Sequence, residues 1–160
     1  MDDKIQTKEK NHKAVYGTLS KIKLKVKKVG YYNYAPWTEC WDEVMKAYPL
    51  STFKVYETET GFPATIHKLF GGFVKVGVTI EGVERIEIYP ITNNRNLPMK
   101  SERYEHFTYD KFGTIKSKSW VEPIDSFAIN TSIKRAMVKC LAYFGLGLYI
   151  YAGEDLPEED

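Results

Sequence analysis

Residue types that often perform catalysis are sparse in this sequence and follow no recognisable pattern. The histidines His12, His67 and His106 have no nucleophile or metal ligand at a characteristic spacing, and no phosphate-binding or dinucleotide-binding glycine motif occurs. A magnesium-dependent nuclease needs several converging carboxylates, and the only plausible set is Glu57, Glu59, Glu84 and Glu87. These residues alternate with Lys, Thr and Arg, which is typical of a solvated sheet face. We therefore predict that the protein is not an enzyme and keep a metal-dependent nuclease as a less favoured alternative.

Basic residues interspersed with aromatic ones indicate a different chemistry, the binding of a nucleic acid. Lysine and arginine contact phosphates, and aromatic side chains, which make up 14% of the chain, stack on any base. The alternative is that the cations only form an ordinary exposed surface. The candidate nucleic-acid-binding residues are Lys134, Arg135, Lys139, Lys75, Arg85, Arg95 and Lys68.

Three of these cations lie in the longest helical pattern, which begins after Pro123. Its apolar residues fall on one side of a helical wheel and the cations on the other, which predicts a core face and a cationic face. Asp125 or Ser126 is placed to cap the first turn, and Gly145 provides a left-handed stop. Beyond this glycine we predict a short aromatic strand that ends near Gly153.

The other four candidates lie in or next to a region with the two-residue period of β-strands. We predict strands over residues 53–57, 62–70, 73–80 and 84–91. Gly71-Gly72 and Glu81-Gly82 separate the last three of them and predict tight turns, so that these strands form an antiparallel meander.

The third of these strands has one purely apolar face, formed by Val74, Val76, Val78 and Ile80. An apolar sheet face must be covered, and the long helix is the expected cover. The predicted fold class is therefore α+β, with an antiparallel β-meander packed against a long helix in the C-terminal half. An additional short N-terminal helix is predicted over Trp37–Ala47, where apolar residues recur at helical spacing.

Two further segments have strand periodicity. Lys21–Lys28 alternates lysine with Ile, Leu and Val, which predicts a half-buried strand whose lysines either contact nucleic acid or protect a sheet edge from aggregation. Residues 104–109 and 114–120 flank a D-K-F-G turn and predict a hairpin within the long polar segment 92–122. A segment of this length in a compact domain indicates a functional or oligomer-forming excursion.

Charge is distributed unevenly along the chain. Residues 1–30 contain nine lysines and three acidic residues, whereas the last seven residues contain five acidic ones. We divide the chain into a flexible basic arm (1–20), a single α+β domain that contains the candidate binding residues (21–153) and an acidic tail (154–160). The charged ends indicate an anionic partner, contact between subunits or simply solvated termini.

The two cysteines indicate a cytoplasmic protein. Cys40 and Cys140 are one hundred residues apart, each within an apolar helical pattern, and we predict that both are reduced core residues. The sequence contains neither a signal peptide nor an apolar run long enough to span a membrane, so we expect no membrane association.

The segment Asp125–Pro157 resembles the C-terminal signature of a phage family, the single-strand annealing proteins of the Sak type. The resemblance extends upstream through Tyr32–Pro49, Val74–Gly82 and Tyr89–Asn96, in the expected order. A shorter likeness, I-K-R-A followed by F-G-L-G-L, is similar to the helix motif of the eukaryotic annealing protein Rad-fifty-two.

The resemblance implies a β-β-β-α core, homo-oligomeric rings or filaments, and a basic groove that holds single-stranded DNA with its bases outward. It implies no nucleotide cofactor. Lys134 and Arg135 match a Lys-Arg pair of the related helix motif that is thought to face DNA, whereas Arg95 matches a family position without an assigned role. We also expect residues 144–153 to help form a subunit contact.

The predicted function is therefore binding of single-stranded DNA and annealing of complementary strands in phage recombination and repair. We expect it to proceed without ATP, in a homo-oligomer, in the cytoplasm of the host cell. A phage exonuclease or a host single-strand binding protein is a possible partner. The alternatives are a passive module that binds single-stranded DNA or RNA, the nuclease, and an assembly protein whose charged ends only join subunits.

Overall fold

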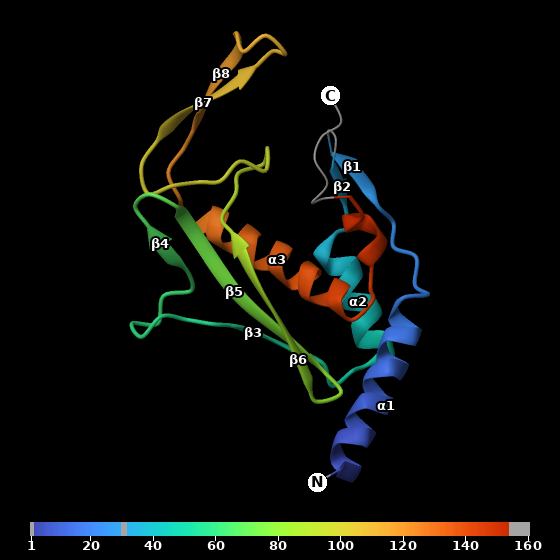
Figure 1. Ribbon diagram of the computed structural model, residues 1–160. Helices are drawn as coiled ribbons and strands as arrows, with labels where there is room; N and C mark the ends of the chain where they lie inside the picture. Colours follow the sequence, from blue (N-terminus) through green and yellow to red (C-terminus); the bar gives the residue numbers. More distant parts are fainter. Residues whose placement is uncertain (1, 30–31, 154–160) are drawn as a thin grey trace. The chain divides into compact units, whose positions relative to one another are not determined.

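The computed structural model describes residues 2–29 and 32–153. The protein is α+β, as predicted (Figure 1). The helices of the described part are α1 (Asp2–Leu19), α2 (Trp37–Ala47), α3 (Ser126–Tyr143) and the short 3-10 helix η1 (Leu148–Tyr151). The strands are β1 (Lys27–Val29), β2 (Tyr32–Tyr34), β3 (Thr52–Val55), β4 (Thr65–His67), β5 (Gly71–Ile80), β6 (Val83–Pro90), β7 (Tyr104–Tyr109) and β8 (Ile115–Val121).

Strand β5 organises the main sheet, because it pairs with β3, β4 and β6. The turn to β6 is formed by Glu81 (φ 49°) and Gly82 (φ 74°), a two-residue left-handed turn that suits the twist of a hairpin. The predicted apolar face of β5 is confirmed, since Val74, Val76, Val78 and Ile80 are at most 1% exposed. The pairing of β5 with β4 and with β6 forms the predicted meander.

The predicted position of the first turn is wrong. Strand β4 covers only Thr65–His67, and the chain reverses over residues 68–70, where the backbone N–H groups of Leu69 and Phe70 donate to His67 Nδ1. Gly71 and Gly72 belong to β5 and are needed for close packing. A Cβ on Gly72 would lie 2.6 Å from Ile124 Cδ1 and 2.7 Å from Ile91 Cδ1, so a larger residue would displace the ends of these two side chains.

Helix α3 begins and ends as the sequence predicts. Asp125 Oδ1 accepts a hydrogen bond of 2.7 Å from the N–H of Ala128, which identifies Asp125 as the cap. At the other end Gly145 has φ 100°, and the N–H of Leu146 donates to the carbonyl of Leu141, as in a Schellman motif. The predicted strand after Gly145 is wrong: Gly147 (φ 69°) starts the 3-10 helix η1 instead.

The chain forms two compact units, and β5, β6 and α3 contribute residues to both. Unit 1 comprises Met1–Lys54, Gly77–Glu87 and Met137–Asp160, and unit 2 comprises Val55–Val76 and Ile88–Ala136. The predicted acidic tail, 154–160, lies outside the described residues.

Unit 1 contains a helix that the sequence analysis missed. Residues 2–19 form α1 where an arm was expected, and its C-terminal part contributes Val15 and Leu19 to the core. The following segment is mostly not a strand, contrary to prediction: only Lys27–Val29 pairs, with β2. Its backbone is held by side chains instead, since the N–H of Leu24 donates to Tyr149 Oη (3.1 Å).

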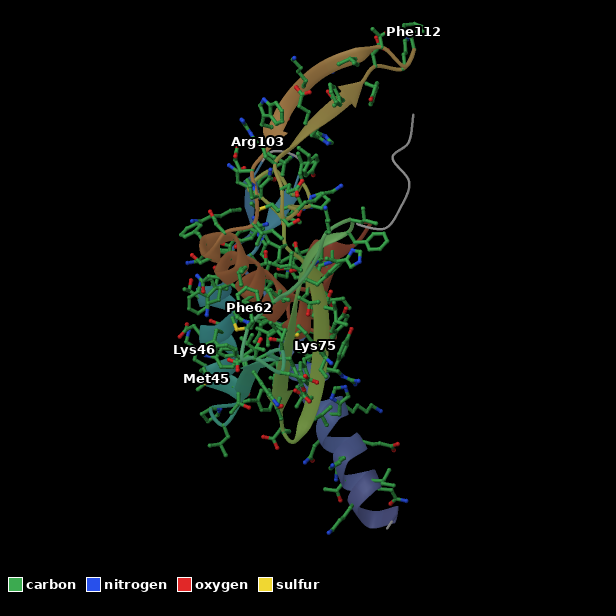
Figure 2. The ribbon with its side chains drawn as sticks, turned by 90° about the vertical axis from the view of Figure 1, so that its left-hand side faces the viewer. Met45, Lys46, Phe62, Lys75, Arg103 and Phe112 are labelled. Carbon is green, nitrogen blue, oxygen red and sulfur yellow. The ribbon has the colours of Figure 1, made fainter. Side chains whose placement is uncertain are left out.

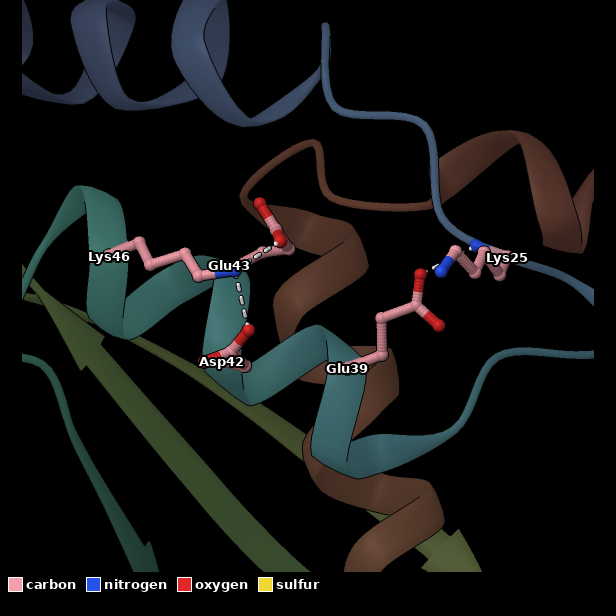
Figure 3. Close-up of polar contacts among 5 residues, drawn as sticks. All are labelled: Lys25, Glu39, Asp42, Glu43 and Lys46. Atoms are coloured by element: carbon pink, nitrogen blue, oxygen red, sulfur yellow. Dashed lines mark hydrogen bonds and ion pairs between the residues drawn. The ribbon is translucent and has the colours of Figure 1, made fainter.

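Helix α2 has the predicted bounds and a polar outer side (Figure 3). Its Glu39 Oε1 accepts a hydrogen bond of 2.7 Å from the N–H of Lys25, and Lys46 Nζ lies 2.6 Å from Asp42 Oδ2 and 3.0 Å from Glu43 Oε1. The inner side contributes Cys40 and Val44 to the core of unit 1, whereas Trp37, Trp41 and Met45 are half-buried.

Unit 2 contains the predicted hairpin, formed by β7 and β8 as a separate two-stranded sheet. Its base is joined to the segment that follows β6: Tyr104 Oη donates to the carbonyl of Pro98 (2.5 Å), and the N–H of Ile124 donates to the carbonyl of Lys100 (2.9 Å). Among the described residues, no helix is both long and apolar enough to cross a membrane.

Candidate nucleic-acid interface

The side chain of Arg135 holds the loop after β6. In this loop Thr92 bridges to Pro98, and Asn93 Oδ1 accepts from the N–H groups of Arg95 (2.9 Å) and Leu97 (3.0 Å). Arg135 Nη1 donates to Thr92 Oγ1 (2.6 Å) and to the carbonyl of Asn93 (3.3 Å). Because its Nη1 atom is used inside the protein, Arg135 positions this loop as well as adding positive charge.

Arg95 lies on the same loop and contacts the β7–β8 hairpin. Its Nη2 atom donates to the carbonyl of Trp120 at 3.0 Å, and its side chain is otherwise exposed. The loop between β6 and β7 therefore links the helix, through Arg135, to the hairpin, through Arg95.

Lys134 and Lys139 lie on α3 and are half-buried rather than fully exposed. Lys134 lies in the part of α3 that belongs to unit 2. Lys139 belongs to unit 1, where its Nζ atom lies 5.3 Å from the centre of the Tyr151 ring. The predicted cationic face of α3 is therefore only partly exposed at these two positions.

Lys75 and Lys68 lie on the exposed side of unit 2. Lys75 projects from β5, with its Nζ atom 4.7 Å from the centre of the Tyr56 ring, and Phe73 lies two residues before it on the same face. Tyr56, Phe73 and Lys75 line a shallow pocket of about 260 Å³ (Figure 2 labels Lys75). Lys68 is exposed in the turn between β4 and β5.

Arg85 lies in unit 1, next to helix α1. Its Nη2 atom lies 2.9 Å from Nε2 of His12, whose ring packs edge-on against Phe144. A guanidinium only donates hydrogen bonds, so Nε2 of the neutral ring accepts and Nδ1 carries the proton. Burial, followed by the charge of Arg85, lowers the pKa of His12 below its usual value.

The structure therefore brings only some of the seven candidates together. Lys68, Lys75, Arg95, Lys134 and Arg135 lie in unit 2, whereas Arg85 and Lys139 lie in unit 1. Arg95 and Arg135 meet through one loop, while Lys75, Lys139 and Arg85 each contact a ring in their own neighbourhood. Whether each of them binds DNA stays a prediction.

Cations of the hairpin region were missed by the sequence analysis. Their charged groups lie over aromatic rings, at 4.2 Å for Arg103 over Trp120, 5.0 Å for Lys100 over Tyr104, and 5.2 Å for Lys111 over Phe112. Such pairs place a positive charge beside an aromatic face, the combination that single-strand binding requires. The alternation of aromatic and basic residues on either side of D-K-F-G was the available signal.

The residues considered for metal catalysis are not grouped. Within residues 2–29 and 32–153, no cluster of three or more His, Cys, Asp or Glu is placed to hold a metal ion. Glu87 instead accepts a hydrogen bond from the Tyr143 hydroxyl of α3.

Both cysteines are free and buried, as predicted. Burial raises the pKa of the Cys40 thiol to about 12, and burial likewise raises the pKa of Cys140 to about 12. Since a thiolate is the nucleophilic form, neither thiol is activated.

A comparison with protein-family models matches residues 13–160 to the family described as the Sak single strand annealing protein. The matched range includes α2, all the strands and α3. No match was found among curated proteins or among solved structures.

Proposed function

The chain belongs to the Sak family of single-strand annealing proteins, and on this premise we propose that it binds single-stranded DNA through unit 2 and pairs complementary strands in phage recombination. The observation that carries the proposal is the family match, which covers nearly the whole chain. The sequence resemblance agrees with it in family and in the order of motifs.

The basic side chains of unit 2 support an electrostatic mechanism. Two complementary strands repel each other through their phosphates, and lysine and arginine lower this repulsion by replacing condensed counterions. A strand held in an extended form also searches for its complement with less loss of freedom than a coiled one. The selectivity should therefore be for the backbone and not for sequence.

Two further properties of the protein are its energy source and its assembly. We propose that annealing needs no ATP, because pairing itself is favourable and only the repulsion and ordering must be reduced. We also propose that the protein acts as a homo-oligomer in the host cytoplasm, so that neighbouring subunits hold successive stretches of one strand. A phage exonuclease or a host single-strand binding protein would supply the strand.

The experiment mixes two complementary labelled oligonucleotides at low salt without ATP, with and without the protein. We expect strand pairing to be faster with the protein. A passive binding module would bind both strands yet leave pairing unchanged or slower, whereas an assembly protein would bind neither. Adding Mg²⁺ tests the nuclease alternative, which predicts shortened strands; intact strands are the outcome that our proposal requires.

A further inference from the structure

The β7–β8 hairpin carries an aromatic face that no other part of its sheet covers. The pairing register places Glu105 opposite Trp120 and Phe107 opposite Lys118, so these four residues share one face. The register shifts between Thr108 and Tyr109, where Lys116 of β8 is skipped, so the alternation of β7 itself places Tyr109 on the face of Phe107. The distance of 3.8 Å between Lys118 Nζ and Glu105 Oε1 agrees with this assignment.

The opposite face of the hairpin is polar in its central part. It contains His106, Ser119, Thr108 and Ser117, and the hydroxyl groups of Thr108 and Ser117 are hydrogen-bonded at 2.5 Å. At the base of the hairpin this face also carries Tyr104 and Val121, whereas Trp120, Phe107 and Tyr109 share the other face of the two-stranded sheet. Trp120 is 48% exposed and Tyr109 is 59% exposed. Aromatic residues that only stabilise the hairpin need not expose so much of their rings.

Positive charge accompanies this aromatic face along its length. Arg103 stacks over Trp120 at the base of the hairpin, Lys118 lies beside Phe107, and Lys111 lies over Phe112 at the tip (Figure 2 labels Arg103 and Phe112). Two of these cations are paired, Arg103 with Glu122 (3.0 Å) and Lys118 with Glu105 (3.8 Å), whereas Asp110 Oδ1 accepts the N–H groups of Phe112 and Thr114 within the turn.

We propose that the Trp120, Phe107 and Tyr109 face of the hairpin is a stacking surface for the bases of single-stranded DNA. This inference rests on the proposed function and adds a contact to the bases, which phosphate-binding cations cannot make. An anionic strand matches the cations beside the rings, while its unpaired bases match the rings themselves.

The spacing of the rings suits a single strand. Residues two apart on a β-strand are about 6.6 Å apart, roughly twice the 3.4 Å between successive bases of a stacked strand. This spacing leaves room for one base to stack between the rings of Phe107 and Tyr109. Duplex DNA offers no free base faces, so this face distinguishes a strand before pairing from the paired product.

The experiment compares two probes of equal length and charge, an oligothymidylate and an oligonucleotide with abasic sites. We expect Tyr109→Ala and Trp120→Ala to bind the oligothymidylate about tenfold more weakly than wild type and the abasic probe equally well. Tyr109→Phe, which keeps the ring, should bind like wild type. The control is His106→Ala, which removes a ring from the opposite face and should change neither affinity.

The remaining outcomes decide against the inference. Wild-type affinity of both alanine variants for the oligothymidylate would overturn it, as would equal weakening for both probes. A change of particle size on gel filtration without a base-dependent change in affinity would make the face a subunit contact. If wild type binds the oligothymidylate but the hairpin variants lose nothing, only this inference fails; if wild type binds no single strand, the proposed function fails with it.

Discussion

Arg135 is bonded within the protein and is also a proposed DNA contact. Its position on α3 and its charge suggest a contact to DNA, but its Nη1 atom is already bound to Thr92 and Asn93. The helical wheel predicted the charge and its face, because both follow from spacing in one element. It could not predict the bond to Thr92, because the partner is more than forty residues away in sequence.

The bond to Thr92 predicts a stability effect. Arg135→Gln should lower the free energy of unfolding by about 1.5–3 kcal/mol, the usual value for a hydrogen bond to a charged group. A double-mutant cycle with Thr92→Val, measured by urea unfolding, isolates the pair. Additive effects of the two substitutions would contradict the account, since the partners would then not be coupled.

Lys134 should affect DNA binding more than folding. Lys134→Ala is expected to reduce the slope of log affinity against log salt concentration by about 0.7, the contribution of one phosphate contact in a single strand. The control is Lys46→Ala, because Lys46 is already paired with Asp42 and Glu43. An unchanged slope for Lys134→Ala would place the phosphate contact on another residue.

His12 predicts a dependence of stability on pH. Its pKa is lowered in the folded protein, so as pH falls below about 6.5 the unfolded chain takes up a proton that the folded one resists. The free energy of unfolding should therefore fall between about pH 7.5 and pH 5.5. His12→Gln should lose less stability over this interval in urea titrations; an identical loss would show that His12 does not contribute.

At the scale of elements, predictions succeeded where the signal is local. The cap and glycine stop of α3, the apolar face of β5, the Glu81-Gly82 turn and the hairpin all follow from nearest neighbours in sequence. Helix α1 was missed because most of its length is polar and exposed, and only its last turns, with Val15 and Leu19, enter the core. The lysine-rich segment after it imitates a strand, but side chains such as Tyr149 satisfy its backbone instead.

Gly72 provides a test of the close packing on β5. Its missing side chain lets Ile91 and Ile124 pack on β5, so Gly72→Ala should lower the free energy of unfolding by about 1–3 kcal/mol through overpacking. Gly17→Ala is a matched control, because a Cβ at Gly17 in α1 meets no atom within 4 Å and alanine favours helix. Thermal denaturation of both variants measures the difference. Equal stabilities would contradict the close packing at Gly72.

At the scale of the whole molecule, the sequence predicted the class of fold and the family, but not how the candidate cations are distributed. Five of the seven belong to unit 2, and the aromatic residues of the proposed stacking surface lie on the hairpin of the same unit. Which unit a cation belongs to depends on contacts between segments that are distant in sequence. Local patterns of charge and hydrophobicity do not predict such contacts.

The central claim is that this chain accelerates the pairing of complementary strands. The most direct measurement is the initial rate of annealing of two labelled oligonucleotides, at low salt and without ATP, over a series of protein concentrations. We expect the rate to rise with protein concentration above the spontaneous rate and to fall back as salt is added. A rate that stays at or below the spontaneous value while both strands are bound would contradict it.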